Sequence, residues 1–106
     1  IYTDEQIAGW RTVTDAVHAA GGCIVVQLWH TGRISHPAMR PDGSTPVSAS
    51  AIAADGELIT YEGRQPFPVP RPLEVDEIQA IVADFAQAAR NAVAAGFDGV
   101  EIHAAN

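Results

Sequence analysis

The chain contains no lysine, has a single cysteine and lacks any long apolar run. Its six basic residues, all arginine, are outnumbered by thirteen acidic ones, which gives a formal net charge of −7 over 106 residues. This shortage of positive charge argues against a partner that is a nucleic acid or an anionic membrane surface. The longest apolar runs fall far short of the ~20 residues of a transmembrane helix. No basic start is followed by an apolar core, so no signal peptide is expected.

The single cysteine, Cys23, excludes a disulfide within the chain. It stands at the start of an apolar run, where a small buried residue is expected rather than a nucleophile. Scarcity of cysteine fits a reducing, cytoplasmic location. The sequence does not begin with Met and stops close to its most informative residues, so we expect residues 1–106 to be part of a longer protein.

Two segments carry the periodicity of amphipathic helices. The first runs through about Ala20, opens on the capping-box sequence Thr3-Asp4-Glu5-Gln6 and ends at Gly21-Gly22. The second spans roughly Val75–Ala95, and Gly96 supplies its stop. The apolar stripes consist of Ile7, Trp10, Val13 and Val17 in the first helix, and of Ile78, Ile81, Val82, Phe85, Ala89, Ala92 and Val93 in the second.

Two apolar runs, at 23–29 and at about Gly99–His103, predict buried strands of a parallel sheet. Residues 30–72 lie between the first strand and the second helix and contain all seven prolines. We expect this segment to be irregular apart from a short hairpin around 58–61, and a connection of this length often serves as a lid or functional excursion. The order helix, strand, long loop, helix, strand predicts an α/β fold: about two αβ units of a (β/α)8 TIM barrel.

Side chains alternate across a strand, which predicts the face on which each residue lies. The apolar members Val26, Leu28, Val100 and Ile102 should face the surrounding helices. The members Gln27, Trp29, Glu101 and His103 should then point into the barrel. His103 stands at the carboxyl end of its strand, where α/β barrels carry out their chemistry, and Asn106 follows three residues later. Such a pair can hold a carbonyl oxygen by donating hydrogen bonds to it, without a proton transfer.

The segments 27–33 (QLWHTGR) and 97–106 (FDGVEIHAAN) resemble the old yellow enzyme family, the flavin-dependent ene-reductases. Further similarity lies at 1–7, 46–52 and 70–74, so the resemblance covers nearly the whole chain. It implies that residues 1–106 are a partial FMN-binding TIM-barrel domain, truncated at both ends. It also implies NADPH or NADH as the reductant and small activated alkenes as substrates.

The resemblance further implies roles for individual residues. His103 and Asn106 match the pair that holds the carbonyl or nitro oxygen of the substrate and stabilises its developing negative charge. The amide of Gln27 matches a residue at the pyrimidine edge of the flavin, and Trp29 matches one that lines the substrate side of the pocket. The proton-donating Tyr and the flavin-phosphate site of the family fall outside residues 1–106. The isolated chain is therefore expected to hold FMN poorly and to be inactive.

Three functions remain open. The leading one is a flavin-dependent ene-reductase that reduces the C=C bond of α,β-unsaturated carbonyl or nitro compounds. A metal-dependent barrel hydrolase using Glu101 and His103 would need more ligands than one strand supplies, so no metal site is expected. The third is an inactive αβ fragment that folds only by assembling with copies of itself or with another chain, and a homo-oligomer is compatible with the sequence.

Overall fold

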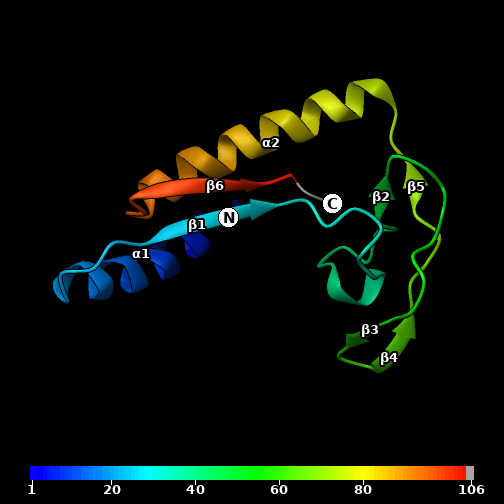
Figure 1. The fold of residues 1–106 in the computed structure, drawn as a ribbon, viewed down its shortest axis with the longest axis horizontal. Helices are drawn as coiled ribbons and strands as arrows, with labels where there is room; N and C mark the ends of the chain where they lie inside the picture. Colours follow the sequence, from blue (N-terminus) through cyan, green and yellow to red (C-terminus); the bar gives the residue numbers. More distant parts are fainter. Residues whose placement is uncertain (105–106) are drawn as a thin grey trace. The chain divides into compact units, whose positions relative to one another are not determined.

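The computed structural model describes residues 1–104, so Asn106 lies outside the described residues. The chain divides into two compact units. One comprises Ile1–Trp29 together with the described residues from Gln79 onward, and the other is His30–Ile78 (Figure 1). No helix among the described residues is long and apolar enough to cross a membrane.

The first unit is built from two helices and two strands. These are α1 (Asp4–Ala19), β1 (Val25–Trp29), the greater part of α2 (Val75–Ala94) and β6 (Gly99–His103). Strands β1 and β6 pair in parallel, with Val25 opposite Gly99 and Trp29 opposite His103 (Figure 1). The helix–strand order that the sequence predicts is therefore confirmed.

The capping box predicted at the start of α1 is present. The hydroxyl of Thr3 accepts a hydrogen bond from the Gln6 backbone N–H at 3.2 Å, and the Gln6 side chain accepts from the Thr3 N–H at 3.4 Å. These contacts satisfy N–H groups that have no partner within the helix. Gly21, with φ of 77°, ends the helix in the left-handed conformation that glycine adopts at low cost.

The carboxyl end of α2 is held by side chains of α1. Thr14 is fully buried and donates its hydroxyl to the Ala95 carbonyl at 2.6 Å, and the guanidinium of Arg11 donates to the Ala94 carbonyl. Gly96 follows with φ of 86°, and a Cβ at this position would lie 2.8 Å from the Thr14 hydroxyl oxygen. Both the backbone conformation and the approach of Thr14 therefore require glycine here.

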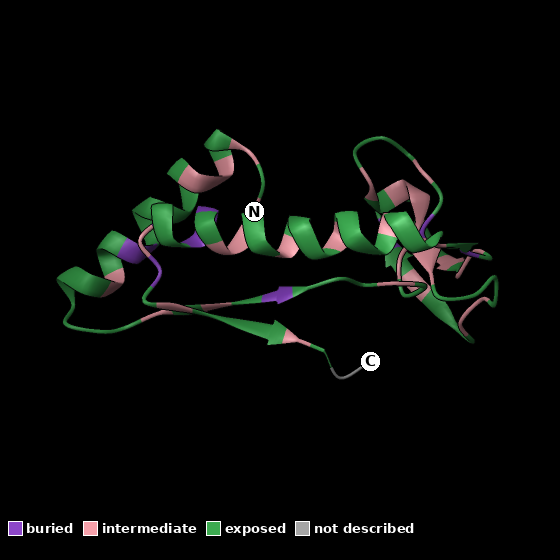
Figure 2. Ribbon diagram, turned by 90° about the horizontal axis from the view of Figure 1, so that it is seen from above, coloured by how far each residue is buried: buried purple, intermediate pink, exposed green. Residues whose placement is uncertain are grey.

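Both helices lie on one side of the β1–β6 pair (Figure 2). Between them and the strands is a small core of Ala92, Ala95 and Phe97, against which Val26 packs. Val26 and Leu28, which is only 7 % exposed, thus lie on the helix side of β1, as predicted. The register partner of Leu28 on β6, Ile102, is less well covered and remains 61 % exposed among the described residues.

The position of Cys23 differs from the sequence-based expectation. Strand β1 begins at Val25, two residues later than predicted, and Cys23 lies in the irregular segment before it, where it is exposed. The expectation of a small buried residue was therefore wrong, because the apolar run extends beyond the paired strand.

The second unit contains more regular structure than predicted. It consists of a short 3-10 helix, η1 (Pro37–Met39), and four short strands, β2 (Val47–Ser48), β3 (Glu57–Thr60), β4 (Gly63–Pro66) and β5 (Arg71–Pro72). β3 and β4 form an antiparallel hairpin, which confirms the hairpin expected around 58–61. β2 and β5 pair in parallel, and nothing in the sequence predicted this pairing.

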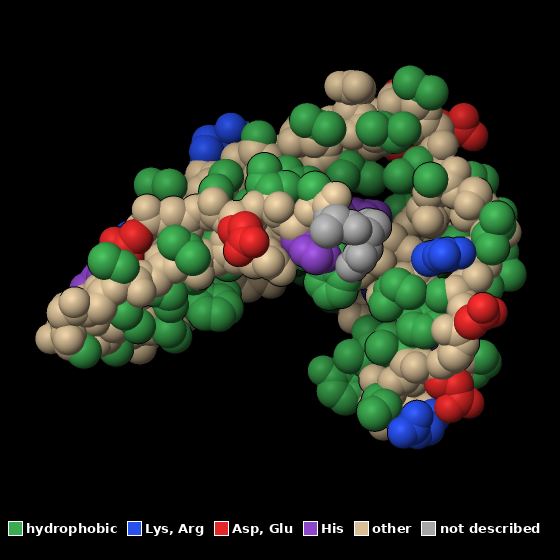
Figure 3. Space-filling view, viewed as in Figure 1, with side chains coloured by type: hydrophobic (Ala, Val, Ile, Leu, Met, Phe, Trp, Pro, Cys, Tyr) green, Lys and Arg blue, Asp and Glu red, His purple; other side chains and the backbone are tan. Residues whose placement is uncertain are grey.

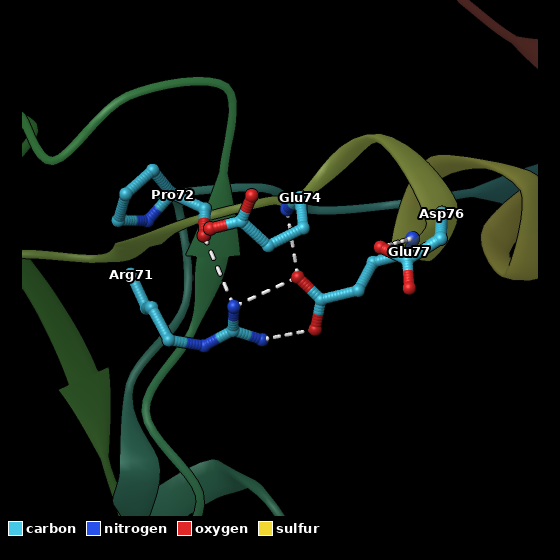
Figure 4. A network of polar contacts seen from close by, with 5 residues as sticks. All are labelled: Arg71, Pro72, Glu74, Asp76 and Glu77. Carbon is cyan, nitrogen blue, oxygen red and sulfur yellow. Dashed lines mark hydrogen bonds and ion pairs between the residues drawn. The ribbon is translucent and has the colours of Figure 1, made fainter.

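A polar network joins β5 to the first turn of α2 (Figure 4). The guanidinium of Arg71 donates to both carboxylate oxygens of Glu77, at 2.8 and 2.6 Å. Glu77 also accepts from the backbone N–H of Glu74 at 2.8 Å, which caps the start of the helix. The hydrogen bonds from Arg71, and then the one from the Glu74 N–H, lower the pKa of Glu77 to about 2.

Candidate active site

Four side chains lie on the face of the β1–β6 pair that is turned away from the helices. Gln27 is opposite Glu101, and Trp29 is opposite His103. Because register partners in parallel strands project to the same side of a sheet, all four share one face. Val26, on the alternate face, packs against the helical core. The strands themselves therefore gather these residues, and no loop is required to do so.

At the carboxyl ends of the two strands, the rings of Trp29 and His103 are in contact. Their centroids lie 5.3 Å apart and their planes make an angle of 88°, an edge-to-face arrangement. His103 is partly buried, whereas Trp29 is 50 % exposed. A neutral imidazole in this position can offer an N–H to an oxygen atom placed beside the exposed indole.

Gln27 and Glu101 lie two residues closer to the amino ends of their strands than Trp29 and His103, and both are exposed. The amide of Gln27 has no hydrogen-bond partner among residues 1–104. An amide donates and accepts at once, which suits the alternating donors and acceptors along the pyrimidine edge of a flavin. The residues of this face are thus compatible with FMN.

The second half of the predicted oxygen-binding pair, Asn106, falls outside the described residues. The convergence of His103 and Asn106 on one oxygen therefore stays a prediction. The described residues also contain no group of three or more His, Cys, Asp or Glu side chains placed to hold a metal ion. Glu101 and His103 have no third such side chain beside them within this part of the chain.

Shortly after β1, two polar side chains form hydrogen bonds with backbone groups of the second unit. The His30 imidazole accepts from the Gly32 N–H at 3.2 Å, and Arg33 donates to the carbonyl of Ile52 at 3.4 Å. These contacts lie within the second unit. They give His30 and Arg33 structural roles in that unit.

A polar cluster at the amino ends of the strands was missed by reasoning from the sequence. Asp98, just before β6, accepts from the backbone N–H of Ile24 at 2.7 Å and contacts the His18 imidazole at 2.9 Å. The hydrogen bond from His18, followed by that from Ile24, holds the pKa of Asp98 below its usual range. No single-sequence signal could identify this cluster, because His18 and Asp98 are 80 residues apart.

Comparison with known proteins places this geometry in a family. The family model described as "NADH:flavin oxidoreductase / NADH oxidase family" matches residues 1–106. Chanoclavine-I aldehyde reductase fgaOx3 of Penicillium roqueforti is 55 % identical over 108 residues, which cover 100 % of this chain and 27 % of the relative. The chain thus spans about a quarter of that relative's length.

Solved structures agree with the sequence comparison. The old yellow enzyme homologue from Zymomonas mobilis superimposes with a TM-score of 0.93 at 47 % identity, covering 98 % of this chain and 29 % of that one. Morphinone reductase in complex with tetrahydroNAD gives a TM-score of 0.89 at 52 % identity, covering 100 % of this chain and 31 % of that one. The fold is accordingly α/β, part of a (β/α)8 barrel. The chain belongs to the NADH:flavin oxidoreductase / NADH oxidase family, the family of the old yellow enzymes.

Proposed function

We propose that the protein containing this chain is an ene-reductase, which reduces the C=C bond of α,β-unsaturated carbonyl or nitro compounds. The observation that carries the proposal is the position of His103. It ends β6 on the same strand face as Gln27 and Trp29, and the chain matches a flavin oxidoreductase family along its whole length.

The cofactor of this family is FMN, and a nicotinamide is its reductant. Bound reduced FMN supplies a hydride to the β-carbon of the alkene. In this proposal the Gln27 amide contacts the pyrimidine edge of the flavin, and the exposed indole of Trp29 lines the substrate side. Either NADPH or NADH serves as the reductant in this proposal, and the rates of flavin reduction by the two identify the preferred one.

The chemical task of His103 follows from where charge develops. Addition of a hydride to the β-carbon places negative charge on the carbonyl or nitro oxygen of the substrate. The imidazole N–H of His103 donates to that oxygen, and Asn106 is proposed as the second donor. Donors fixed before the reaction stabilise this charge without reorganisation, and loss of one such donor typically costs ~10²–10³ in rate.

The experiment compares His103→Ala with the wild type in the full-length flavoprotein. We expect the wild-type protein to be yellow and to bleach with NADPH or NADH under anaerobic conditions. In His103→Ala, reoxidation of the flavin by 2-cyclohexenone should slow by ~10²–10³. Reduction of the flavin by the nicotinamide should survive better, because loss of a hydride builds positive charge on the nicotinamide ring and no oxyanion develops in that step. Stopped-flow absorbance of the flavin separates the two half-reactions.

The matched control is His18→Ala, since it removes an imidazole from the same unit at the amino ends of the strands. This variant should keep the wild-type rate of alkene reduction. Equal alkene turnover in His103→Ala and His18→Ala would refute the role of His103. A colourless wild-type protein with bound zinc would instead favour a hydrolase, which no cluster of ligands among the described residues supports.

A further inference from the structure

We propose that Trp29 is a positioning residue for His103: its indole fixes the orientation in which the imidazole donates to the substrate oxygen. The inference rests on the proposed function, because it presumes that His103 binds that oxygen. It adds to Trp29 a role that lining the substrate pocket does not include.

The contact itself is specified by the backbone. Trp29 and His103 are register partners on hydrogen-bonded parallel strands, so the strand pairing sets the distance between their Cα atoms. Their ring centroids are 5.3 Å apart with an interplanar angle of 88°. Aromatic rings favour this edge-to-face geometry because the positive edge of one ring meets the negative face of the other.

The orientation of the His103 ring decides whether its N–H can reach the substrate oxygen. His103 is the last residue of β6, and the torsion about the bond to an imidazole ring is broad rather than sharply staggered. A hydrogen bond weakens steeply once its angle falls below about 120°. A modest rotation of the imidazole would therefore turn its N–H away from the oxygen. The indole, attached to the neighbouring strand, restricts that rotation.

Direct lining of the pocket and positioning of His103 predict different coupling between the two residues. A residue that only lines the pocket touches the ligand itself, so its removal acts whether or not His103 is present. A positioning residue acts through the imidazole, so its removal has no further effect once the imidazole is gone. A double-mutant cycle measures this difference.

The cycle uses the full-length oxidised flavoprotein, with 4-chlorophenol as the probe for the oxygen site and flavin absorbance as the readout. The four proteins are the wild type, Trp29→Leu, His103→Ala and the double variant. We expect Trp29→Leu to weaken phenol binding ~tenfold when His103 is present, and less than about twofold in the His103→Ala background. An equal loss in both backgrounds would overturn the positioning role and leave Trp29 as a lining residue.

Two further measurements keep the inference testable if Trp29→Leu loses the flavin. Trp29→Phe retains an aromatic ring and should keep phenol affinity within about threefold of the wild type. NMR of ¹³C-labelled histidine should show a ring-current shift at His103 that changes in Trp29→Phe, because a phenyl ring has a weaker ring current than an indole. An unchanged His103 resonance would contradict the contact.

The design separates this inference from the function on which it rests. If His103→Ala alone leaves phenol affinity unchanged, the oxygen-binding role of His103 fails and the positioning role fails with it. If His103→Ala weakens the binding but the effect of Trp29→Leu is the same in both backgrounds, the oxygen-binding role stands and only the positioning role is lost.

Discussion

At the residue scale, Asp98 ties the beginnings of both strands to α1. Its carboxylate accepts from the Ile24 N–H and contacts the His18 imidazole, and these contacts keep its pKa below the usual range. A carboxyl group whose pKa is lowered by folding contributes stability above its unfolded pKa. That contribution is lost as the pH falls through the folded pKa.

We therefore expect Asp98→Ala in the full-length protein to lower Tm by about 2 °C at neutral pH, measured by differential scanning calorimetry. The difference from the wild type should shrink in acid, where the wild-type carboxylate is itself protonated. Asp15→Ala, which removes an exposed aspartate from α1, should leave Tm unchanged. A pH-independent difference for Asp98→Ala would contradict the electrostatic explanation.

A second residue-scale prediction concerns Glu77, whose pKa is about 2. Because the hydrogen bonds from Arg71 are the largest cause, Arg71→Gln should raise this pKa towards the ordinary value. The N–H of Glu74 should still keep it somewhat low. NMR of the Glu77 side-chain carboxyl carbon measures both titrations. In the wild type Glu77 should remain ionised at about pH 3.5. An identical titration in Arg71→Gln would show that the paired geometry of Figure 4 does not persist in solution.

At the element scale, the junction of α2 with β6 depends on Gly96. Gly96→Ala forces a side chain into the left-handed region, at a cost of ~1–2 kcal/mol, and places its Cβ 2.8 Å from the Thr14 hydroxyl. We expect a loss of at least ~2 kcal/mol in unfolding free energy by chemical denaturation.

The matched control is Gly9→Ala within α1, where a Cβ would meet nothing within 4 Å. This substitution should stabilise the protein by ~0.4–1 kcal/mol, because alanine favours the helix and restricts the unfolded chain. Equal effects of the two substitutions would show that neither the positive φ nor the contact with Thr14 matters.

The elements differ in how far the sequence predicts them. The cap at Thr3, the glycine stops and the period of the apolar stripes are local, so α1, α2 and β6 were predicted within a residue or two. Alternation along the strands also placed Gln27 and His103 on one face, in agreement with the register. The β2–β5 pairing and the contact of His18 with Asp98 join distant segments, and a single sequence carries no local signal for either.

At the scale of the whole molecule, many large apolar side chains remain exposed on the described residues (Figure 3). In the first unit they include Val25, Trp29, Val82, Val93 and Ile102. Apolar side chains left exposed in this number favour association in water. We expect residues 1–106, expressed alone, to self-associate and to bind added FMN only weakly.

Size-exclusion chromatography with light scattering and fluorescence titration of FMN test this expectation. The full-length protein, measured in parallel, should bind FMN. A monomeric, FMN-binding polypeptide of residues 1–106 would show that the strand face described here is sufficient for the cofactor.

The strands of the second unit pair with one another, β2 with β5 and β3 with β4, all within residues 30–78. The exposed turn at Tyr61 and Glu62 projects from that hairpin. This self-contained pairing makes the excursion a natural place for evolutionary variation and for engineering. Peptides grafted at its tip, or whole hairpins exchanged between homologues, should leave the partnership of β1 with β6 intact.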